Sequence, residues 1–236
     1  CFRKDGKIVQ NMPRALADMD TFAPANYDLI DVETYFSKKG RRQFDYISST
    51  GCYYRCTFCA DPFVFKRKFS AIAPTRMGAE LGAYHAKYQF TDINFQDETF
   101  FTYAKRSREF AQELLDRNMK VTWAATMRAD QGTRMDSADW ELSKRAGLRR
   151  LLIGVESGSQ EMMDYLKKDI KMEQVMECAE ICQRLDIDVH FPFIVGFPNE
   201  TQASIDATVA MVKQLSGMSP GFRTPIFYYK PYPGSK

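Results

Sequence analysis

Six short runs rich in β-branched and aromatic residues alternate with stretches of helical spacing, and this order constrains the fold more than any other feature. The β-rich runs are Phe44–Ser49, Thr91–Phe95, Lys120–Ala125, Arg150–Val155, Asp188–Val195 and Thr224–Tyr229. The helical stretches are Pro74–Tyr88, Ala104–Asn118, Ser137–Ala146, Glu161–Leu185 with a break near Lys168–Lys171, and Gln202–Leu215. Strands that alternate with helices become parallel strands joined by right-handed crossovers. The sequence therefore predicts an α/β fold.

The number of strands narrows the architecture further. Six strands and five crossovers suit a partial (β/α)6 TIM-like barrel better than a closed barrel of eight strands. A chain of 236 residues, 44% hydrophobic and 27% charged, is long enough for one large domain and excludes disordered and fibrous classes. The longest apolar run, from His190 to Pro198, is too short to cross a bilayer, so we expect no membrane span.

The net charge and the first residues indicate which partners, location and neighbouring segments to expect. Thirty-three basic and thirty acidic residues give a net charge of +3, which is too balanced for a nucleic-acid partner. The start does not resemble a signal peptide, so we expect a cytoplasmic protein. Because the first residue is Cys1 and not Met, we expect that the chain begins inside a longer protein. Residues 1–43 carry prolines and acids without a sustained period, which predicts an extended linker.

Chemically active residues follow each β-rich run. In parallel α/β folds, ligands bind at the carboxyl ends of the strands, so these residues should meet at one edge of the sheet. In chain order they are the cysteine cluster 52–59, Gln96-Asp97-Glu98, Met127-Arg128-Ala129-Asp130, Glu156-Ser157-Gly158, Gly196-Phe197-Pro198 and Lys230-Pro231-Tyr232. We therefore expect thiolates, carboxylates and an arginine on one rim.

Cys52, Cys56 and Cys59 form a C-x3-C-x2-C motif. Thiolates in one loop suit a soft metal or an iron–sulfur cluster. Four cysteines would complete a [4Fe–4S] cluster, whereas three leave one iron open to a small molecule. A structural zinc site would need a fourth ligand, and neither His85 nor His190 lies in the loop. The remaining alternative is three incidental core cysteines.

Cys178 and Cys182 invite a second metal site. They share one face of a predicted helix with Ile181 and Leu185, whose apolar side chains indicate a core position. No further cysteine nearby completes a cluster, so we interpret both as packing residues.

The cysteine motif, with Phe58 before its last cysteine, resembles the signature of the radical S-adenosylmethionine (SAM) superfamily, and the resemblance runs from Phe44 to Lys236. It implies that Cys52, Cys56 and Cys59 ligate three irons of a [4Fe–4S] cluster, that SAM chelates the fourth, and that Phe58 belongs to the cofactor site. It implies an enzyme that cleaves SAM reductively to a 5′-deoxyadenosyl radical, with a small-molecule substrate and a reductant such as flavodoxin or ferredoxin.

Gln96-Asp97-Glu98 departs from the Gly-Gly-Glu that is frequent in this family and resembles an acidic variant of the cobalamin-dependent members. The resemblance implies that a carboxylate there accepts hydrogen bonds from the ammonium group of SAM. Because successive strand residues alternate faces, only one of Asp97 and Glu98 should point to the ligand. The alternative is that the acid caps its own helix.

The later rim residues match further parts of the family's SAM site. Arg128 could pair with the SAM carboxylate, or form a salt bridge to Asp130 or to a neighbouring loop. Glu156 and Ser157 resemble the residues that meet the ribose hydroxyls. Gly196 lies in a run that resembles the adenine-side motif, where the apolar strand end could equally be core.

Three segments resemble the cobalamin-dependent branch, which includes methyltransferases and the ring cyclase of bacteriochlorophyll synthesis. They are Ile8–Tyr35, Glu156–Gln160 and Tyr229–Ser235. The resemblance implies a cobalamin-binding domain before Cys1, a linker at residues 1–43, and a radical SAM core at 44–236 that is truncated at its C-terminus.

The predicted reaction is cobalamin-dependent methyl transfer to an unactivated carbon. The alternatives are a cobalamin-dependent cyclase or oxidoreductase without methyl transfer, a methylthiotransferase, and, from a different class, a non-catalytic iron–sulfur or zinc binding module.

Overall fold

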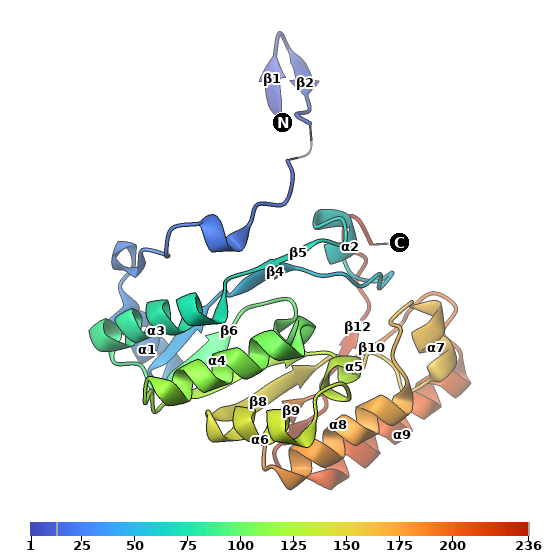
Figure 1. The fold of residues 1–236 in the computed structure, drawn as a ribbon. Helices are drawn as coiled ribbons and strands as arrows, with labels where there is room; N and C mark the ends of the chain where they lie inside the picture. The colour runs from blue at the N-terminus through green and yellow to red at the C-terminus, as the bar shows by residue number, and fades with distance from the viewer. Residues whose placement is uncertain (13, 236) are drawn as a thin grey trace.

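Six parallel strands form the main sheet of the computed structural model, which describes residues 1–12 and 14–235 (Figure 1). Pro13 of the predicted linker and Lys236 at the end of the predicted core lie outside the described residues. In spatial order the strands are β3 (Gln43–Tyr46), β6 (Asp92–Phe95), β7 (Thr122–Met127), β8 (Leu148–Ile153), β9 (Asp188–His190) and β11 (Phe222–Arg223). Spatial order follows chain order, and every neighbouring pair is parallel. The predicted α/β fold and partial (β/α)6 barrel are confirmed.

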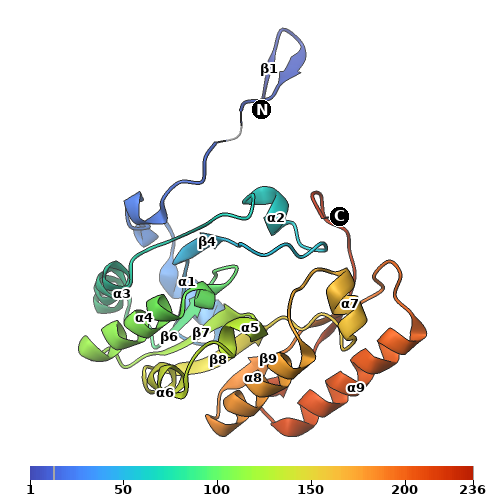
Figure 2. The same ribbon diagram turned by 45° about the vertical axis from the view of Figure 1, so that its right-hand side comes forward.

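Helices connect these strands and cover one face of the sheet. Figure 2 shows α4, α6, α8 and α9 along that face. The connecting helices are α3 (Pro74–Tyr88), α4 (Ala104–Asp116), α5 (Ala129–Gly132), α6 (Ser137–Arg145), α7 (Gln160–Tyr165), α8 (Met172–Arg184) and α9 (Gln202–Met218). The predicted helix 161–185 is therefore two helices, with a loop at the expected break. None of the helices in the described ranges is long and apolar enough to cross a membrane.

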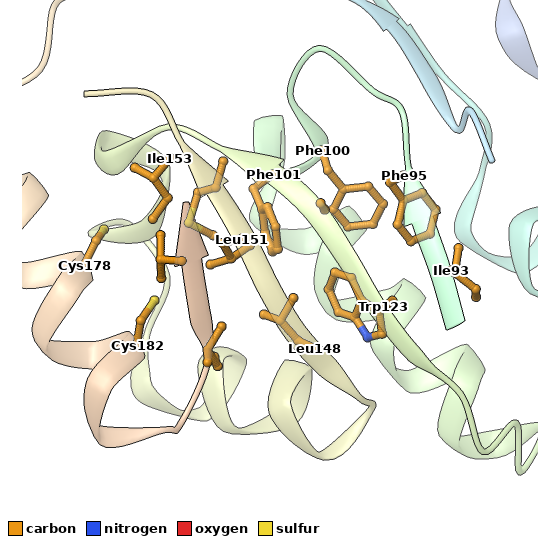
Figure 3. Close-up of a cluster of buried hydrophobic side chains, with 14 of the residues drawn as sticks. Ile93, Phe95, Phe100, Phe101, Trp123, Leu148, Leu151, Ile153, Cys178 and Cys182 are labelled. Carbon is orange, nitrogen blue, oxygen red and sulfur yellow. The ribbon is translucent and has the colours of Figure 1, made fainter. Parts of the chain in front are cut away.

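The core lies between the sheet and these helices. Alternate strand residues such as Ile93, Phe95 and Trp123 point to the helices and are almost fully buried, as Figure 3 shows. Full burial of one such side chain contributes roughly 1.5–3 kcal/mol to stability. Cys178 and Cys182 on α8 belong to the same core and expose no surface, which confirms that both are packing residues.

Two prolines divide the last two strands. Phe193 lies opposite Ile226, and Val189 lies opposite Phe222, so both pairs have the same offset along the chain. Pro192 and Pro225 therefore lie opposite each other, between these two pairs. Proline has no N–H to donate, so the ladder is interrupted there. Beyond the two prolines, the predicted runs 188–195 and 224–229 form a separate parallel pair of strands, β10 (Phe193–Val195) and β12 (Ile226–Tyr228).

The N-terminal segment is more ordered than predicted. It contains a hairpin, β1 (Phe2–Lys4) and β2 (Lys7–Val9), two 3-10 turns, η1 (Met19–Thr21) and η2 (Tyr27–Leu29), and a helix, α1 (Val32–Lys39). The expectation of an extended segment up to residue 43 is wrong for α1. Asp31 caps this helix by accepting a hydrogen bond from the Thr34 N–H at 3.1 Å, and Phe36 is buried against the barrel. Eight residues are too few for a sustained helical period, which is why the sequence pattern missed it.

A buried carboxylate ties the amino ends of four strands together. Asp92 on β6 accepts hydrogen bonds from Gln43 on β3 at 2.6 Å, Thr122 on β7 at 2.7 Å and Arg149 on β8 at 2.5 Å. Burial raises the pKa of Asp92, but the bonds from Arg149, Thr122 and Gln43 outweigh it and hold that pKa below its usual value.

We expect Asp92→Ala to lower the free energy of unfolding at pH 7 by about 3 kcal/mol, because Arg149 would lose its buried partner. Since the folded-state pKa is depressed, this contribution is present above the unfolded pKa of about 3.9 and disappears as the pH falls through the folded-state value. Urea titrations of both proteins at pH 7 and near pH 3 measure the difference. Asp188→Ala, on an exposed strand carboxylate, is the control; equal losses in the two variants would contradict the prediction.

Candidate functional site

The three cysteines lie on a loop that extends over the carboxyl edge of the sheet. The loop follows β4 (Ser49–Gly51) and leads into α2 (Asp61–Val64), after which β5 (Phe69–Ala71) returns antiparallel to β4 (Figure 1). Gly51 fixes where the loop begins: its φ is +89°, and a Cβ there would lie 2.1 Å from the carbonyl oxygen of Lys68. Only glycine allows this approach of two backbones.

The cysteine thiols are free and differ in depth. Cys56 is buried, whereas Cys52 and Cys59 are half-buried. Burial raises the pKa of Cys52, and raises the pKa of Cys59 to about 12, with Cys56 adding to both shifts. Thiols of raised pKa are protonated near neutral pH, so a metal that binds them has to displace their protons.

The donor set fits an iron–sulfur cluster. Within residues 1–12 and 14–235, no three His, Cys, Asp or Glu side chains converge closely enough to hold one metal ion. In an iron–sulfur cluster each cysteine binds a different iron, so the three sulfur atoms need not converge on one point. Three soft donors on a single, partly buried loop suit such a group.

Arg128, directly after β7, contacts the deepest cysteine. Its Nη1 lies 3.7 Å from the Sγ of Cys56, its Nε donates to Asp130 at 2.9 Å, and its Nη2 donates to the carbonyl oxygen of Lys168 at 2.5 Å. The guanidinium also stacks on the ring of Tyr54, 3.4 Å from its centroid. The salt bridge to Asp130 that the sequence left as an alternative is therefore present. All three guanidinium nitrogens therefore have partners within the protein, and the Nη1 contact brings Arg128 to the cysteine loop.

The loop between α7 and α8 also holds the cysteine loop in place. The backbone N–H of Thr57 donates to the carbonyl oxygen of Leu166 at 2.9 Å. The guanidinium of Arg55 forms a bidentate pair with Asp169, at 2.8 and 3.0 Å. The break in the predicted helix 161–185 thus supplies residues 166–169 as a wall of the site.

Lys168 in this wall forms a buried ion pair with Glu156, which follows β8. The Nζ–Oε1 distance is 2.6 Å, and the two side chains expose only 8% and 9% of their surface. Glu156 has a φ of +69°, an uncommon backbone conformation for a residue with a side chain. The Nζ of Lys168 also lies 5.6 Å from the ring centroid of Phe58. Lys168 was not predicted as a site residue. The pair Lys167-Lys168, which interrupts an apolar helical pattern, is the sequence feature that could have indicated it.

Asp97 and Glu98, after β6, have different surroundings. Asp97 is buried and accepts hydrogen bonds from the N–H of Ser48 at 2.7 Å and the hydroxyl groups of Ser48 and Ser49 at 2.6 and 2.5 Å. Glu98 is half-buried and accepts from the N–H of Gly51 at 3.1 Å. Burial raises the pKa of both carboxyl groups. Asp97 therefore braces the strand that precedes the cysteines, and Glu98 is the one of the two that contacts the start of the cysteine loop.

Ser157 and Gly196 also differ in what they can reach. Ser157 exposes no surface, and its Oγ lies 3.2 Å from the Oγ1 of Thr208 on α9. That contact holds α9 to the segment that follows β8, and the hydroxyl group is buried. Gly196, at the end of β10, has a φ of +86°, and its N–H donates to Glu200.

A cavity of about 500 Å³ lies between the cysteine loop and the last strands. Phe58, Glu156 and Ile194 line it, together with residues 226–230 and Tyr232. The ring of Phe58 packs edge-to-face on Phe197, with 5.8 Å between centroids. The cavity thus brings together Phe58 of the cysteine motif, Glu156 after β8 and Ile194 of β10. The sequence placed these three on one rim from the positions of the strands alone.

Comparison with known proteins places the chain among radical SAM proteins. Residues 46–212 match the Radical SAM superfamily. A protein of Pyrococcus horikoshii named as an uncharacterized methyltransferase is 25% identical over 237 residues, which cover 100% of this chain and 50% of that protein. The anaerobic magnesium-protoporphyrin IX monomethyl ester cyclase of Rubrivivax gelatinosus is 25% identical over 211 residues, or 89% of this chain and 38% of the cyclase. The chain thus spans half or less of these relatives.

Two solved structures share the fold. The radical SAM methyltransferase TsrM of Kitasatospora setae, with tryptophan and a SAM analogue bound, superposes with a TM-score of 0.69 at 17% identity, over 79% of this chain and 36% of TsrM. The cobalamin-dependent SAM radical enzyme OxsB, with aqua-cobalamin and SAM bound, gives 0.66 at 23% identity, over 83% of this chain and 29% of OxsB.

Proposed function

Because this chain belongs to the radical SAM superfamily, we propose that it is the core of an enzyme that holds a [4Fe–4S] cluster and cleaves SAM reductively. The observation that carries the proposal is the C-x3-C-x2-C loop, which the fold holds at the carboxyl edge of a parallel sheet with Cys56 buried beside Arg128. Such edges are where parallel α/β folds bind their ligands. When bound, the cluster and SAM supply a 5′-deoxyadenosyl radical that abstracts hydrogen.

The protein's own residues would hold and shield these groups. Cys52, Cys56 and Cys59 would each bind one iron. Glu98, half-buried beside Gly51, is the carboxylate that suits the ammonium group of SAM. Lys168 is a buried cation near the cysteine loop that suits the carboxylate of SAM.

The cavity of about 500 Å³ is our candidate for the nucleoside part of SAM. Glu156 offers acceptors for ribose hydroxyl groups, and Ile194 with Gly196 offers an apolar strand end for the adenine. Phe58, packed on Phe197, would exclude water from the sulfur-bearing end.

We further propose cobalamin-dependent methyl transfer to an unactivated carbon, with residues 1–43 joining the core to a cobalamin-binding domain of the natural protein. The relative named as a methyltransferase, which matches all of this chain, supports this assignment. A radical cyclase is the second candidate, since a relative of the same identity carries that name.

Anaerobic reconstitution of the natural full-length protein tests the core proposal. We expect four irons and four sulfides per chain, and 5′-deoxyadenosine on addition of SAM and dithionite. A single bound zinc without SAM cleavage would sink the proposal. SAM labelled in its methyl group then separates the two candidate reactions. Label transferred to bound cobalamin supports methylation, and cobalamin that never acquires label supports cyclisation.

A further inference from the structure

The face of the main sheet that points away from the helices is open. Figure 2 shows α4, α6, α8 and α9 along the opposite face. Leu151 and Ile153 on β8 point to those helices and are fully buried (Figure 3). Leu152, between them, points to the other face and exposes 42% of its surface. An exposed leucine in the middle of a six-stranded sheet indicates a surface that binds another molecule.

This open face continues into the cavity that we propose for the nucleoside part of SAM. Phe191 and Phe193 are fully buried in the core, so the residues that alternate with them face the other way. These are His190, Pro192 and Ile194. Pro192 and Ile194 line the cavity of about 500 Å³. His190 precedes Pro192 by two residues, a distance of about 7 Å along a strand. The open face therefore begins directly below the cavity.

Strand pairing groups polar side chains on this face. Leu152 pairs with His190, and His190 pairs with Arg223, so these three lie side by side on β8, β9 and β11. One position lower on the same face, Arg150 pairs with Asp188. Neighbouring strands lie about 4.8 Å apart, so the Cα atoms of Arg150, His190 and Arg223 lie within roughly 12 Å of one another.

An irregularity in β8 aims Arg150 at the open face. Trp123 of β7 pairs with Leu148, and the next residue, Ala124, pairs with Arg150, so β8 holds one extra residue, Arg149. Without this bulge, alternation would place Arg150 on the same face as Leu148, which is buried in the core. Bulges redirect side chains in this way and are frequent beside active sites.

Arg150 is a half-buried cation without a partner. In the part of the chain that the structure describes, no hydrogen bond or salt bridge engages its guanidinium, and none of its nitrogens is closed off from solvent. Burial lowers the pKa of Arg150, and the nearby charges of Arg149 and Arg41 lower it further. Asp92 and Asp188 offset this only in part. A cation held beside other cations favours an anion next to it.

Positive charge exceeds negative charge on this face. Two of its acids, Asp45 and Asp92, already pair with Lys39 and Arg149. Asp188 is then the acid that remains against Arg150 and Arg223.

His190 lies within this positive field. Burial lowers the pKa of His190, and the charges of Arg150 and Arg223 lower it further, against the opposing effect of Asp188. His190 is therefore neutral near pH 7, and its imidazole can still donate a hydrogen bond to an anion.

We propose that this open face binds an elongated anionic substrate, whose carboxylate or phosphate group pairs with Arg150 and Arg223 while its apolar part lies on Leu152. A guanidinium offers two parallel N–H donors, which fit either group. The inference rests on the proposed function, because it gives the substrate class of the proposed radical reaction. Asp188, level with Arg150, precedes Pro192 by four residues, or roughly 13 Å of strand. The substrate therefore holds its anionic group far from the carbon that reacts.

Binding of matched probes to the reconstituted full-length protein tests this proposal. 1-Naphthoate and 1-naphthyl phosphate carry the two anionic groups on one ring system, and 1-naphthylmethylamine carries a positive charge on the same rings. Arg150→Gln removes the unpaired charge, and Arg150→Lys keeps it. Arg145→Gln, on the exposed surface of α6, is the matched control. Anaerobic equilibrium dialysis gives the dissociation constant of each probe.

We expect one anion per chain at saturation, and at least about tenfold weaker binding of the amine. Arg150→Gln should weaken binding of the preferred anion at least about tenfold, and Arg150→Lys should weaken it less, because only the planar fork is lost. Arg223→Gln should also weaken it, which keeps the test decisive if Arg150→Gln does not fold. Arg145→Gln should bind as the unmodified protein does. The tighter of the two anions identifies the group as carboxylate or phosphate.

Several results would overturn the proposal. One is equal binding of the amine and the anions, and another is the lack of saturable anion binding to the full-length protein. A third is anion binding by folded Arg150→Gln and Arg223→Gln that is as tight as in Arg145→Gln. Anion binding that depends on Arg150 in a protein that holds no cluster and cleaves no SAM would instead refute the proposed function, so the two failures are distinct.

Discussion

Replacement of Cys56 by alanine should abolish both iron binding and 5′-deoxyadenosine formation. Cys56 is the most buried of the three motif cysteines and the one that Arg128 contacts, at 3.7 Å. Two remaining thiols leave two irons without a protein ligand, and no other cysteine of the chain lies in the loop. Iron and sulfide analysis after anaerobic reconstitution, with the electron paramagnetic resonance spectrum of the reduced protein, measures the loss.

Cys178→Ala is the matched control for this variant, because Cys178 is a fully buried thiol in the core away from the loop. It should keep its full iron content and SAM cleavage while losing some stability. Circular dichroism must show both variants folded at the assay temperature. Four irons in folded Cys56→Ala would contradict the ligand assignment.

Lys168→Met should have the second largest effect, on stability and on SAM binding together. The variant leaves the carboxylate of Glu156 buried without its cation, which costs about 3–5 kcal/mol. We also expect SAM affinity of the cluster-loaded protein to fall at least about tenfold, because the carboxylate of SAM would lose a charge-assisted partner. Urea unfolding and anaerobic equilibrium dialysis measure the two effects.

A double variant separates these two effects. Lys168→Met/Glu156→Gln removes both charges, so most of the lost stability should return. SAM affinity should stay low, since the cation is still missing and the carboxylate proposed for the ribose hydroxyl groups is replaced by an amide. Recovery of SAM binding in the double variant would show that Lys168 only neutralises Glu156 and does not bind SAM.

Local patterns in the sequence were sufficient for much of the fold. The bounds of α3 were predicted to the residue, because Pro74 marks the first turn and apolar residues repeat at helical spacing behind it. The strand runs 188–195 and 224–229 were predicted as unbroken, although Pro192 and Pro225 stood within them. That prediction followed the apolar character of the two runs. In the structure the two prolines, which have no N–H to donate, divide the strands.

The site was predictable where spacing along the chain fixes it and not where distant segments meet. Three cysteines in one short loop can be recognised from their spacing alone. The contact of Arg128 with Cys56 joins residues 72 positions apart, so it could be found only in the folded structure. The alternation of side chains along a strand predicted that only one of Asp97 and Glu98 would face the ligand. Because β6 ends at Phe95, before both residues, alternation could not predict which of them it would be.

The contacts between the cysteine loop and residues 166–169 also order events during synthesis. Thr57 and Arg55 bind residues 109 and 114 positions further along the chain. Because a protein leaves the ribosome from its N-terminus, the cysteines emerge well before their clamp exists. The clamped loop that we propose to hold the cluster can therefore form only after β8 and α7 have been made. A nascent chain that stalls before residue 166 presents three unclamped thiols to oxidants.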